Sequence, residues 1–157
     1  MTKNKLEKAF SKSLQADTDL WGMKLHNNML AHQITPADYI ISYNKRLFSL
    51  FLHLVECKQV TCKMGKGRFA FKRLHQRYDL ENFENHNPYH HSWVCLAYWD
   101  GRWSNSEVYL IPINAMASVI DSSTNMSMNR IDAKLLWEDF RIPLKPGSIF
   151  DLSKIKS

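Results

Sequence analysis

The stretch "LFSLFLHLVECKQ", residues 47–59, limits the fold more than any other part of this 157-residue chain. Its length suits a β-strand, and its nearly unbroken apolar character is typical of a central strand that is buried on both faces. The last four residues of the stretch include Glu56, Cys57 and Lys58. Because successive side chains of a strand point to opposite faces, Glu56 and Lys58 share one face. Two opposite charges placed there form either a salt bridge or a functional site.

The patterns around this strand predict a mixed α/β domain. Leu6, Phe10 and Leu14 form one apolar stripe, which predicts a helix over residues 4–15. We expect strands at 21–26, 37–44, 47–59, 91–99 and 108–113, turns at 44–46 and 100–107, loops at 61–69 and 121–129, helices at 71–86, 114–121 and 131–140, and an irregular segment at 141–148. The order α-β-β-β-α-β-β predicts a mixed central sheet flanked by helices. We expect a single domain over 1–157, with its core at about 4–120 and a helical or irregular C-terminal extension at 121–157.

Composition is that of an ordinary globular domain, with 45% hydrophobic and 23% charged residues. The N-terminus "MTKNKLEKAF" has no apolar segment after its positive charges, and no apolar run approaches the length of a membrane span. We therefore expect neither a signal peptide nor a membrane span. The odd number of cysteines, Cys57, Cys62 and Cys95, favours reduced thiols in the cytoplasm over a disulfide framework. A zinc site is not favoured, because no second Cys/His pair stands at finger spacing.

Positive charge is concentrated in one segment. The net charge is +6, and seven of the 21 Lys and Arg residues lie between positions 58 and 77, where there is no Asp or Glu. The other 14 bases are balanced by 15 acids. Concentrated positive charge attracts a polyanion, most commonly nucleic acid. The alternative is a solvated basic surface without a partner.

Asp38 stands near the start of the strand that precedes the 47–59 stretch. If the two strands form an antiparallel hairpin, Asp38 lies across from Glu56. Two neighbouring carboxylates raise each other's pKa unless a cation lies between them. Carboxylate and carbonyl oxygens are suitable ligands for Mg²⁺, so the main-chain carbonyl of Cys57 could complete the site. Lys58 would then orient a water molecule or stabilise charge on a phosphate.

These residues resemble the PD-(D/E)xK nuclease motif. The matching segments are "PADYI" and "LVECK", in which Asp38, Glu56 and Lys58 form the signature. The predicted order of elements is similar to the αβββαβ core of the restriction-endonuclease-like fold, and the resemblance covers about residues 4–120. A Glu in the first helix and a Gly-interrupted basic segment that leads into "FKRLHQRYDL" narrow the similarity to Holliday-junction resolvases of the archaeal and RecU type, including relatives encoded by phages.

The resemblance implies a structure-specific DNA endonuclease that resolves four-way junctions by metal-dependent hydrolysis of phosphodiesters. It implies Mg²⁺, with Mn²⁺ as a possible substitute, bound by Asp38, Glu56 and the main-chain carbonyl of Cys57. Lys58 would assist the attacking water, and Glu7 and Gln76 would lie at the active site.

Partners also follow from the resemblance. Two symmetric cuts in branched DNA imply a homodimer, in the cytoplasm or in a host's cytoplasm if the chain is encoded by a phage. The DNA backbone would be held by basic side chains of the segment after the motif, namely Lys63, Lys66, Arg68, Lys72, Arg73 and Arg77.

Alternatives remain open at this point. The chain could be another nuclease on the same core, of a restriction or end-processing type, or a nucleic-acid-binding module without catalysis. Glu56 and Lys58 could form a simple surface pair, and Asp38 could only start a strand. Histidines 86, 90 and 91 could form a general-base cluster, although loop and strand-edge roles are favoured. The aromatic residues of the late hairpin could stack bases, although core packing is favoured; they are Trp93, Tyr98, Trp99, Trp103 and Tyr109.

Overall fold

The computed structural model describes residues 5–26, 35–43 and 51–156, and all structural statements below concern these residues. Four α-helices lie within them: α1 (Lys5–Ala16), α2 (Arg77–His86), α3 (Ile113–Ser122) and α4 (Arg130–Trp137). The strands are β1 (Leu20–Lys24), β2 (Tyr39–Tyr43), β3 (Leu52–Thr61), β4 (Arg68–Ala70), β5 (His90–Asp100), β6 (Arg102–Pro112), β7 (Ser127–Asn129), β8 (Leu144–Lys145) and β9 (Ile149–Phe150). None of the helices in these ranges is long and apolar enough to cross a membrane.

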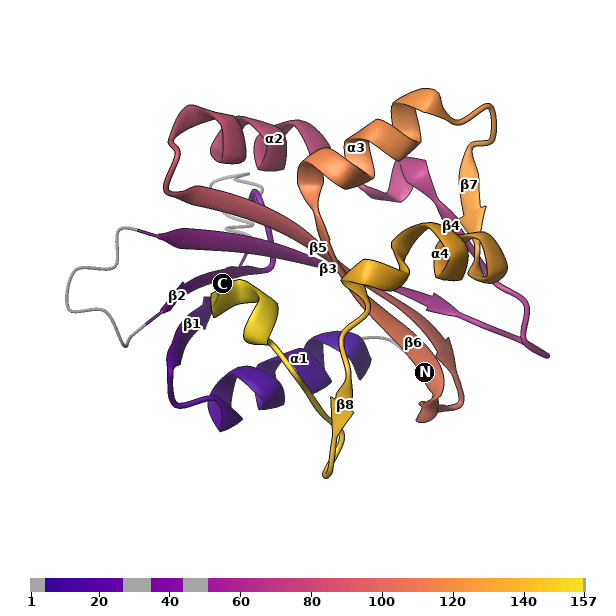
Figure 1. Cartoon of the computed structure of the whole chain (residues 1–157), viewed down its shortest axis with the longest axis horizontal. Helices are drawn as coiled ribbons and strands as arrows, with labels where there is room; N and C mark the ends of the chain where they lie inside the picture. The colour runs from indigo at the N-terminus through magenta and orange to yellow at the C-terminus, as the bar shows by residue number, and fades with distance from the viewer. Residues whose placement is uncertain (1–4, 27–34, 44–50, 157) are drawn as a thin grey trace.

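A five-stranded mixed sheet forms the centre of the molecule (Figure 1). Its strand order is β1-β2-β3-β5-β6, so the predicted central position of the strand that carries Glu56 is confirmed. Neighbouring strands are antiparallel except for β3 and β5, which run parallel. A parallel pair needs a long crossover, and here the crossover contains β4 and α2. The predicted mixed α/β class with helices around a central sheet is therefore confirmed.

Two apolar clusters cover the two faces of the sheet. On one face, α1 and the C-terminal segment pack through Phe10 and Phe150 against Val55. On the other face, α2, α3 and α4 pack against Leu54, and Trp137 of α4 is fully buried there. Figure 1 shows α1 on one side of the sheet and α2 with α3 on the other. Since Leu54 and Glu56 are two residues apart in a strand, Glu56 points to the face covered by α2 and α3.

The predicted helix over 71–86 is wrong in its first half. Phe71–Arg73 form a short 3₁₀ turn, and α2 begins only at Arg77. The reason is tertiary: the main-chain N–H of Phe71 donates to the carbonyl of Met126, and the Phe71 ring packs into the core beside Phe69. These contacts keep the residues after β4 out of the helical conformation. The helix therefore begins about one and a half turns later than predicted.

The predicted loops at 61–69 and 121–129 are also wrong in part. Arg68–Ala70 forms β4, which pairs antiparallel with β7 (Ser127–Asn129) from the second loop. Strand β6 begins at Arg102 in what was expected to be a long turn, because Gly101 reverses the chain by itself at a φ of 82°. The segment expected to be irregular contains β8, which pairs with β9. The turn predicted at 44–46 lies outside the described residues.

Candidate active site

Asp38 lies directly beyond the last paired residues of β2 and β3. The ladder between these strands runs from Ser42–Leu52 to Tyr39–Val55. The N–H of Asp38 then donates to the carbonyl of Val55 at 3.1 Å, and its Oδ2 accepts a hydrogen bond from the N–H of Cys57 at 2.8 Å. The predicted hairpin and the position of Asp38 across from the end of the apolar stretch are therefore both present.

Glu56 is a buried carboxylate with only half of its hydrogen-bonding capacity used. Its side chain is 2% exposed, and its Oε1 lies 2.6 Å from Nζ of Lys58. Its Oε2 is buried without a hydrogen-bond partner among the described residues. A simple surface pair is excluded, because an exposed ion pair leaves both oxygens to water. A buried, unpaired carboxylate oxygen is costly and is typical of a position that awaits a ligand.

Burial and neighbouring negative charge raise the pKa of both acids at this site. The pKa of Glu56 is raised to about 7, mainly by burial and next by the negative charge of Asp38, and this value already includes the opposing effect of Lys58. Burial also raises the pKa of Asp38, against the effect of the hydrogen bond from Cys57. Lys58 therefore compensates only part of the charge at this site. Such perturbed carboxylates are typical of functional sites.

Glu7 reaches the site from α1, and a lysine that the sequence analysis did not select accompanies it. Oε2 of Glu7 lies 2.5 Å from Nζ of Lys24, the last residue of β1. Burial raises the pKa of both Asp38 and Glu56, and the negative charge of Glu7 also raises both pKa values. The positive charge of Lys24 lowers the pKa of Asp38. The strand pairing of Lys24 with Tyr39, next to Asp38, brings this lysine to the site, and no local motif signals it.

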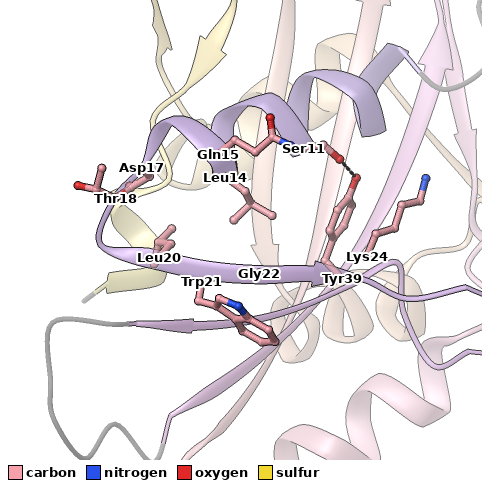
Figure 2. A pocket seen from close by; sticks show the side chains of 10 residues that line it. All are labelled: Ser11, Leu14, Gln15, Asp17, Thr18, Leu20, Trp21, Gly22, Lys24 and Tyr39. Carbon is pink, nitrogen blue, oxygen red and sulfur yellow. Dashed lines mark hydrogen bonds between the residues drawn. The ribbon is translucent and has the colours of Figure 1, made fainter.

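Tyr39 ties α1 to the sheet beside the acids. Its hydroxyl donates to the main-chain carbonyl of Glu7 at 2.9 Å and forms a hydrogen bond of 2.6 Å with Ser11. Figure 2 shows Tyr39 and Lys24 at one end of a pocket of about 360 Å³ between α1 and β1. The lining of this pocket includes neither Asp38 nor Glu56, so the pocket is next to the acidic pair and separate from it.

The backbone of β3 has an open edge at the site. Leu52 and Cys62 donate their N–H groups toward β5, so the even-numbered residues of β3 face that strand. Val55 and Cys57 face β2 instead. Because the N–H and C=O of one residue in a strand point to the same neighbour, the carbonyl of Cys57 points into the space beside Asp38 where β2 has ended.

Arg73 lies along the same open edge. Its Nη2 donates to the main-chain carbonyl of Gln59 at 2.9 Å, and its guanidinium lies 5.9 Å from the ring centre of Phe69. Gln59 is two positions beyond Cys57, a distance of about 7 Å along the strand. An exposed cation therefore lies beside the acids, at a position suited to an anionic ligand.

The six basic residues that were predicted to bind DNA divide into two groups. Lys63, Lys66, Arg68, Lys72 and Arg73 are exposed. Arg77 differs, because its guanidinium lies 2.7 Å from Asp121 and 3.3 Å from Glu81. Its charge is therefore already matched by two carboxylates from α2 and α3.

Gln76 takes part in none of the contacts that join the acids and lysines above. It is the residue before the first turn of α2, and its Oε1 is buried without a hydrogen-bond partner among the described residues. The α2 helix covers the face of the sheet to which Glu56 points. Gln76 thus shares a face with Glu56, although no hydrogen bond joins the two side-chain oxygens that are left unpaired.

His90 and His91 lie at the start of β5, four and three positions before Val94, the sheet partner of Glu56, whereas His86 is the last residue of α2. His91 stacks on His53 and lies 3.6 Å from Glu84, whereas the ring of His90 stacks on Phe83. Burial, together with the nearby His91, lowers the pKa of His53 to about 4. These packed rings support the structural interpretation of the histidines.

The aromatic residues of the late hairpin mainly serve the core, as was favoured. Tyr98, Trp99 and Tyr109 are buried, and Trp93 donates a hydrogen bond to His53. Trp103 differs from them, because it remains half-buried near the tip of the hairpin.

No protein-family model matches the chain, and no curated protein matches it.

Proposed function

We propose that the chain is a metal-dependent DNA endonuclease of the PD-(D/E)xK type that resolves four-way junctions. The observation that carries this proposal is the buried Glu56, whose unpaired Oε2 lies beside Asp38 and Lys58 where β2 separates from β3. A surface salt bridge has no need of a second acid or of a buried free oxygen. A site that holds a cation next to a phosphate needs both.

The available oxygen donors fit a Mg²⁺ ion that is bound partly by the protein and partly by water. Asp38 and Glu56 would supply carboxylate oxygens, and Cys57 would supply its main-chain carbonyl, which faces the same space. Within the described part of the chain, no group of three or more His, Cys, Asp or Glu side chains could hold a metal. Two carboxylates, one carbonyl and several waters are the type of set that Mg²⁺ accepts, whereas zinc prefers nitrogen and sulfur ligands.

The protein's own groups have separate tasks in this proposal. A bound Mg²⁺ would polarise the scissile phosphate and lower the pKa of a coordinated water. Lys58 holds its ammonium 2.6 Å from Glu56, where it would position the attacking water and stabilise negative charge on the phosphate. Glu7 and Lys24 form a second ion pair beside the acids, and Tyr39 fixes the helix that carries Glu7. Gln76 would contact substrate or water from α2.

The topology supports the same assignment. An α-helix, three antiparallel strands, a crossover with a helix and a parallel strand follow each other in the order α1-β1-β2-β3-α2-β5. Apart from the short β4 before α2, this order is similar to the αβββαβ core of the restriction-endonuclease-like fold, which supports the proposal. Asp38 directly precedes β2 and Glu56 lies on β3, so the two acids are next to each other where the strands separate, in agreement with the motif.

DNA would approach from the open edge of β3. Arg73 already lies on this edge, and the exposed side chains of Lys63, Lys66, Arg68 and Lys72 come from the adjoining segment. Cations of this kind bind the phosphate backbone without reading sequence, which suits an enzyme that recognises shape. Arg77 would have a structural role instead, because Glu81 and Asp121 already pair with it.

Junction resolution also requires a homodimer, and α4 is the candidate surface. Three large apolar side chains of this helix are exposed, with Leu135 at 78%, Ile131 at 73% and Leu136 at 55%. A two-fold interface uses the same patch on both copies. We expect Leu135→Glu to convert a dimer into a monomer in analytical ultracentrifugation, and a wild-type chain that sediments as a monomer at all concentrations would contradict the dimer.

A substrate panel tests the proposal. The purified chain is incubated with a labelled four-way junction, a linear duplex of the same arm sequence and the corresponding single strand, each with Mg²⁺ or with EDTA. We expect paired cuts in the junction with Mg²⁺, little cutting of the other substrates, and binding without cutting in EDTA. Equal cutting of the linear duplex would favour the restriction or end-processing alternative. Binding without any metal-dependent cutting would favour the non-catalytic module.

A further inference from the structure

A small pocket outside the acidic site combines positive charge with aromatic surface. It measures about 230 Å³ and lies between α1, the tip of the β5–β6 hairpin and the turn that joins β8 to β9. This is smaller than the pockets of about 300–1,000 Å³ that enclose drug-sized ligands. It therefore suits a single ring system whose substituents remain outside. The lining consists of Lys5, Lys8, Ala9, Lys12, Trp99, Trp103 and Ser148.

Three lysines surround this pocket on one face of α1. Positions 5, 8 and 12 are three and four residues apart, so their side chains are neighbours on the helix surface. Lys5 places its Nζ 5.1 Å from the ring centre of Trp99, and Lys12 donates to the carbonyl of Gly147 at 2.6 Å. Lys8 is exposed and forms no hydrogen bond or ion pair within the described chain. No acid lines the pocket, so these like charges favour an anionic ligand.

Tryptophan rings form the apolar side of the pocket. Trp99 and Trp103 meet edge to face with their ring centres 4.6 Å apart, and Trp103 meets Phe150 in the same manner at 5.1 Å. Packing from two sides fixes the indole of Trp103, although part of it stays exposed. A fixed indole offers a flat surface on which another aromatic ring can stack. Cations beside such a surface match a ligand that is aromatic and anionic at once.

We propose that this pocket binds one unpaired nucleotide of a DNA strand, with the base stacked on Trp103 and the phosphates held by Lys5, Lys8 and Lys12. Stacking on aromatic side chains next to a positively charged track is the general way in which single strands are bound. In a continuous duplex every base is already stacked and paired, so a base can enter only from an unpaired position or after it has flipped out.

The pocket lies within reach of the strand that would be cut. Trp99 pairs with Thr61 in the sheet, five residues beyond Glu56 and about 16 Å along β3. The N–H of Leu6 in the first turn of α1 donates to the side chain of Gln59 at 3.0 Å, which holds this end of α1 over the same edge. A strand that leaves the acids can therefore reach the lysines of α1. The inference relies on the proposed function only for the choice of DNA as the ligand.

Tryptophan fluorescence of the full chain, titrated in EDTA with a short oligothymidylate or with duplex DNA, tests the proposal without any cleavage step. Thymine is expected to quench the emission of the wild type, and the single strand to bind more tightly than the duplex. Lys8→Gln should lower the slope of log affinity against log salt by about 0.7, the value for one phosphate of a single strand. Its matched control is Lys134→Gln, an exposed lysine on α4, which should leave the slope unchanged.

Trp103→Leu removes the stacking surface and should weaken single-strand binding by about tenfold, the loss expected for one stacked base. Trp103 also packs on Phe150, so the melting temperature of the Trp103→Leu variant is measured in parallel. Lys8→Gln provides a second test that does not depend on packing. Wild-type affinity and salt slope in Lys8→Gln would overturn the proposal, as would equal binding of single strand and duplex by the wild type. Failure of junction cleavage alone would overturn the proposed function and leave this pocket supported by its own binding data.

Discussion

Replacing Glu56 with Gln should stabilise the metal-free protein at alkaline pH, although the change removes an ion pair. Gln has nearly the same shape as Glu, and it avoids the charge that burial and Asp38 oppose. The pKa of Glu56 is raised from 4.5 to about 7. The folded chain therefore keeps a proton on Glu56 that the unfolded chain releases as the pH rises from about 4.5 to 7. Since the folded state binds more protons in this window, stability falls as the pH rises through it.

The size of this effect follows from the shift. One pKa unit corresponds to about 1.4 kcal/mol, so ionised Glu56 costs the folded state about 3 kcal/mol above pH 7. The attraction of Lys58 is already included, because it is one of the contributions to the shifted pKa. Glu56→Gln should recover most of this free energy at pH 8 and none of it below about pH 4. For a domain of this size, 1 kcal/mol changes the melting temperature by about 2–4 °C, so we expect an increase of about 6–12 °C.

Thermal unfolding followed by circular dichroism at pH 4 and pH 8, with EDTA or with Mg²⁺, measures this difference. Mg²⁺ should stabilise the wild type at pH 8, by about 3 kcal/mol at a hundredfold excess over its dissociation constant, and should not stabilise Glu56→Gln. The control Glu138→Gln changes a carboxylate that is 56% exposed and only weakly paired with Arg141, and it should behave as the wild type. Destabilisation by Glu56→Gln at pH 8 in EDTA, or equal stabilisation of both chains by Mg²⁺, would refute the reasoning.

Four further substitutions test other parts of the structure. Arg73→Ala should lower the salt slope of duplex binding by about 0.9, while Arg77→Ala should leave it unchanged because Asp121 and Glu81 already pair with Arg77; equal slopes for the two variants in fluorescence anisotropy would contradict this division. Tyr39→Phe removes a hydroxyl hydrogen-bonded to the carbonyl of Glu7 and should lower the free energy of unfolding in urea by about 1 kcal/mol, an unchanged value being the contrary result. Gly67→Ala would place a methyl group 2.8 Å from both the Cys62 sulfur and a Val60 methyl and should cost about 1–3 kcal/mol; a variant as stable as the wild type would show that this contact relaxes.

Much of the site could be predicted from the sequence because it depends on local rules. The period of two along a strand predicts that Glu56 and Lys58 share a face, and the 2.6 Å contact between them agrees. A hairpin between consecutive strands predicts Asp38 across from Glu56, and the hydrogen bond that Asp38 accepts from the neighbouring Cys57 N–H agrees, although β3 continues to Thr61. The helical stripe predicts α1, and Glu7 lies close enough for its charge to affect both acids.

The remainder depends on contacts between distant residues. Asp121, which neutralises Arg77, is 44 residues away from it in the chain, so charge counting over the basic segment includes a cation that is already paired. The pairing of β4 with β7 joins residues about 60 positions apart, and neither short segment has a strand pattern of its own. Lys24 comes beside Tyr39 and Asp38 through the register of β1 on β2, and it meets Glu7 through the position of α1 next to β1. Such pairings are determined by the packed core, and local periodicity does not encode them.

Cleavage of a labelled four-way junction by Asp38→Asn gives the most direct test of the account. Asn keeps an oxygen that can accept the hydrogen bond from Cys57, so the fold should persist while one metal-binding carboxylate is lost. Single-turnover rates with Mg²⁺ are compared with those of the wild type and of Asp139→Asn, an exposed acid in the turn after α4. We predict that Asp38→Asn binds the junction and cuts it at least about a hundredfold more slowly, which corresponds to about 2.7 kcal/mol of lost stabilisation, while Asp139→Asn cuts at the wild-type rate. Undiminished cutting by Asp38→Asn would contradict the assignment of this site.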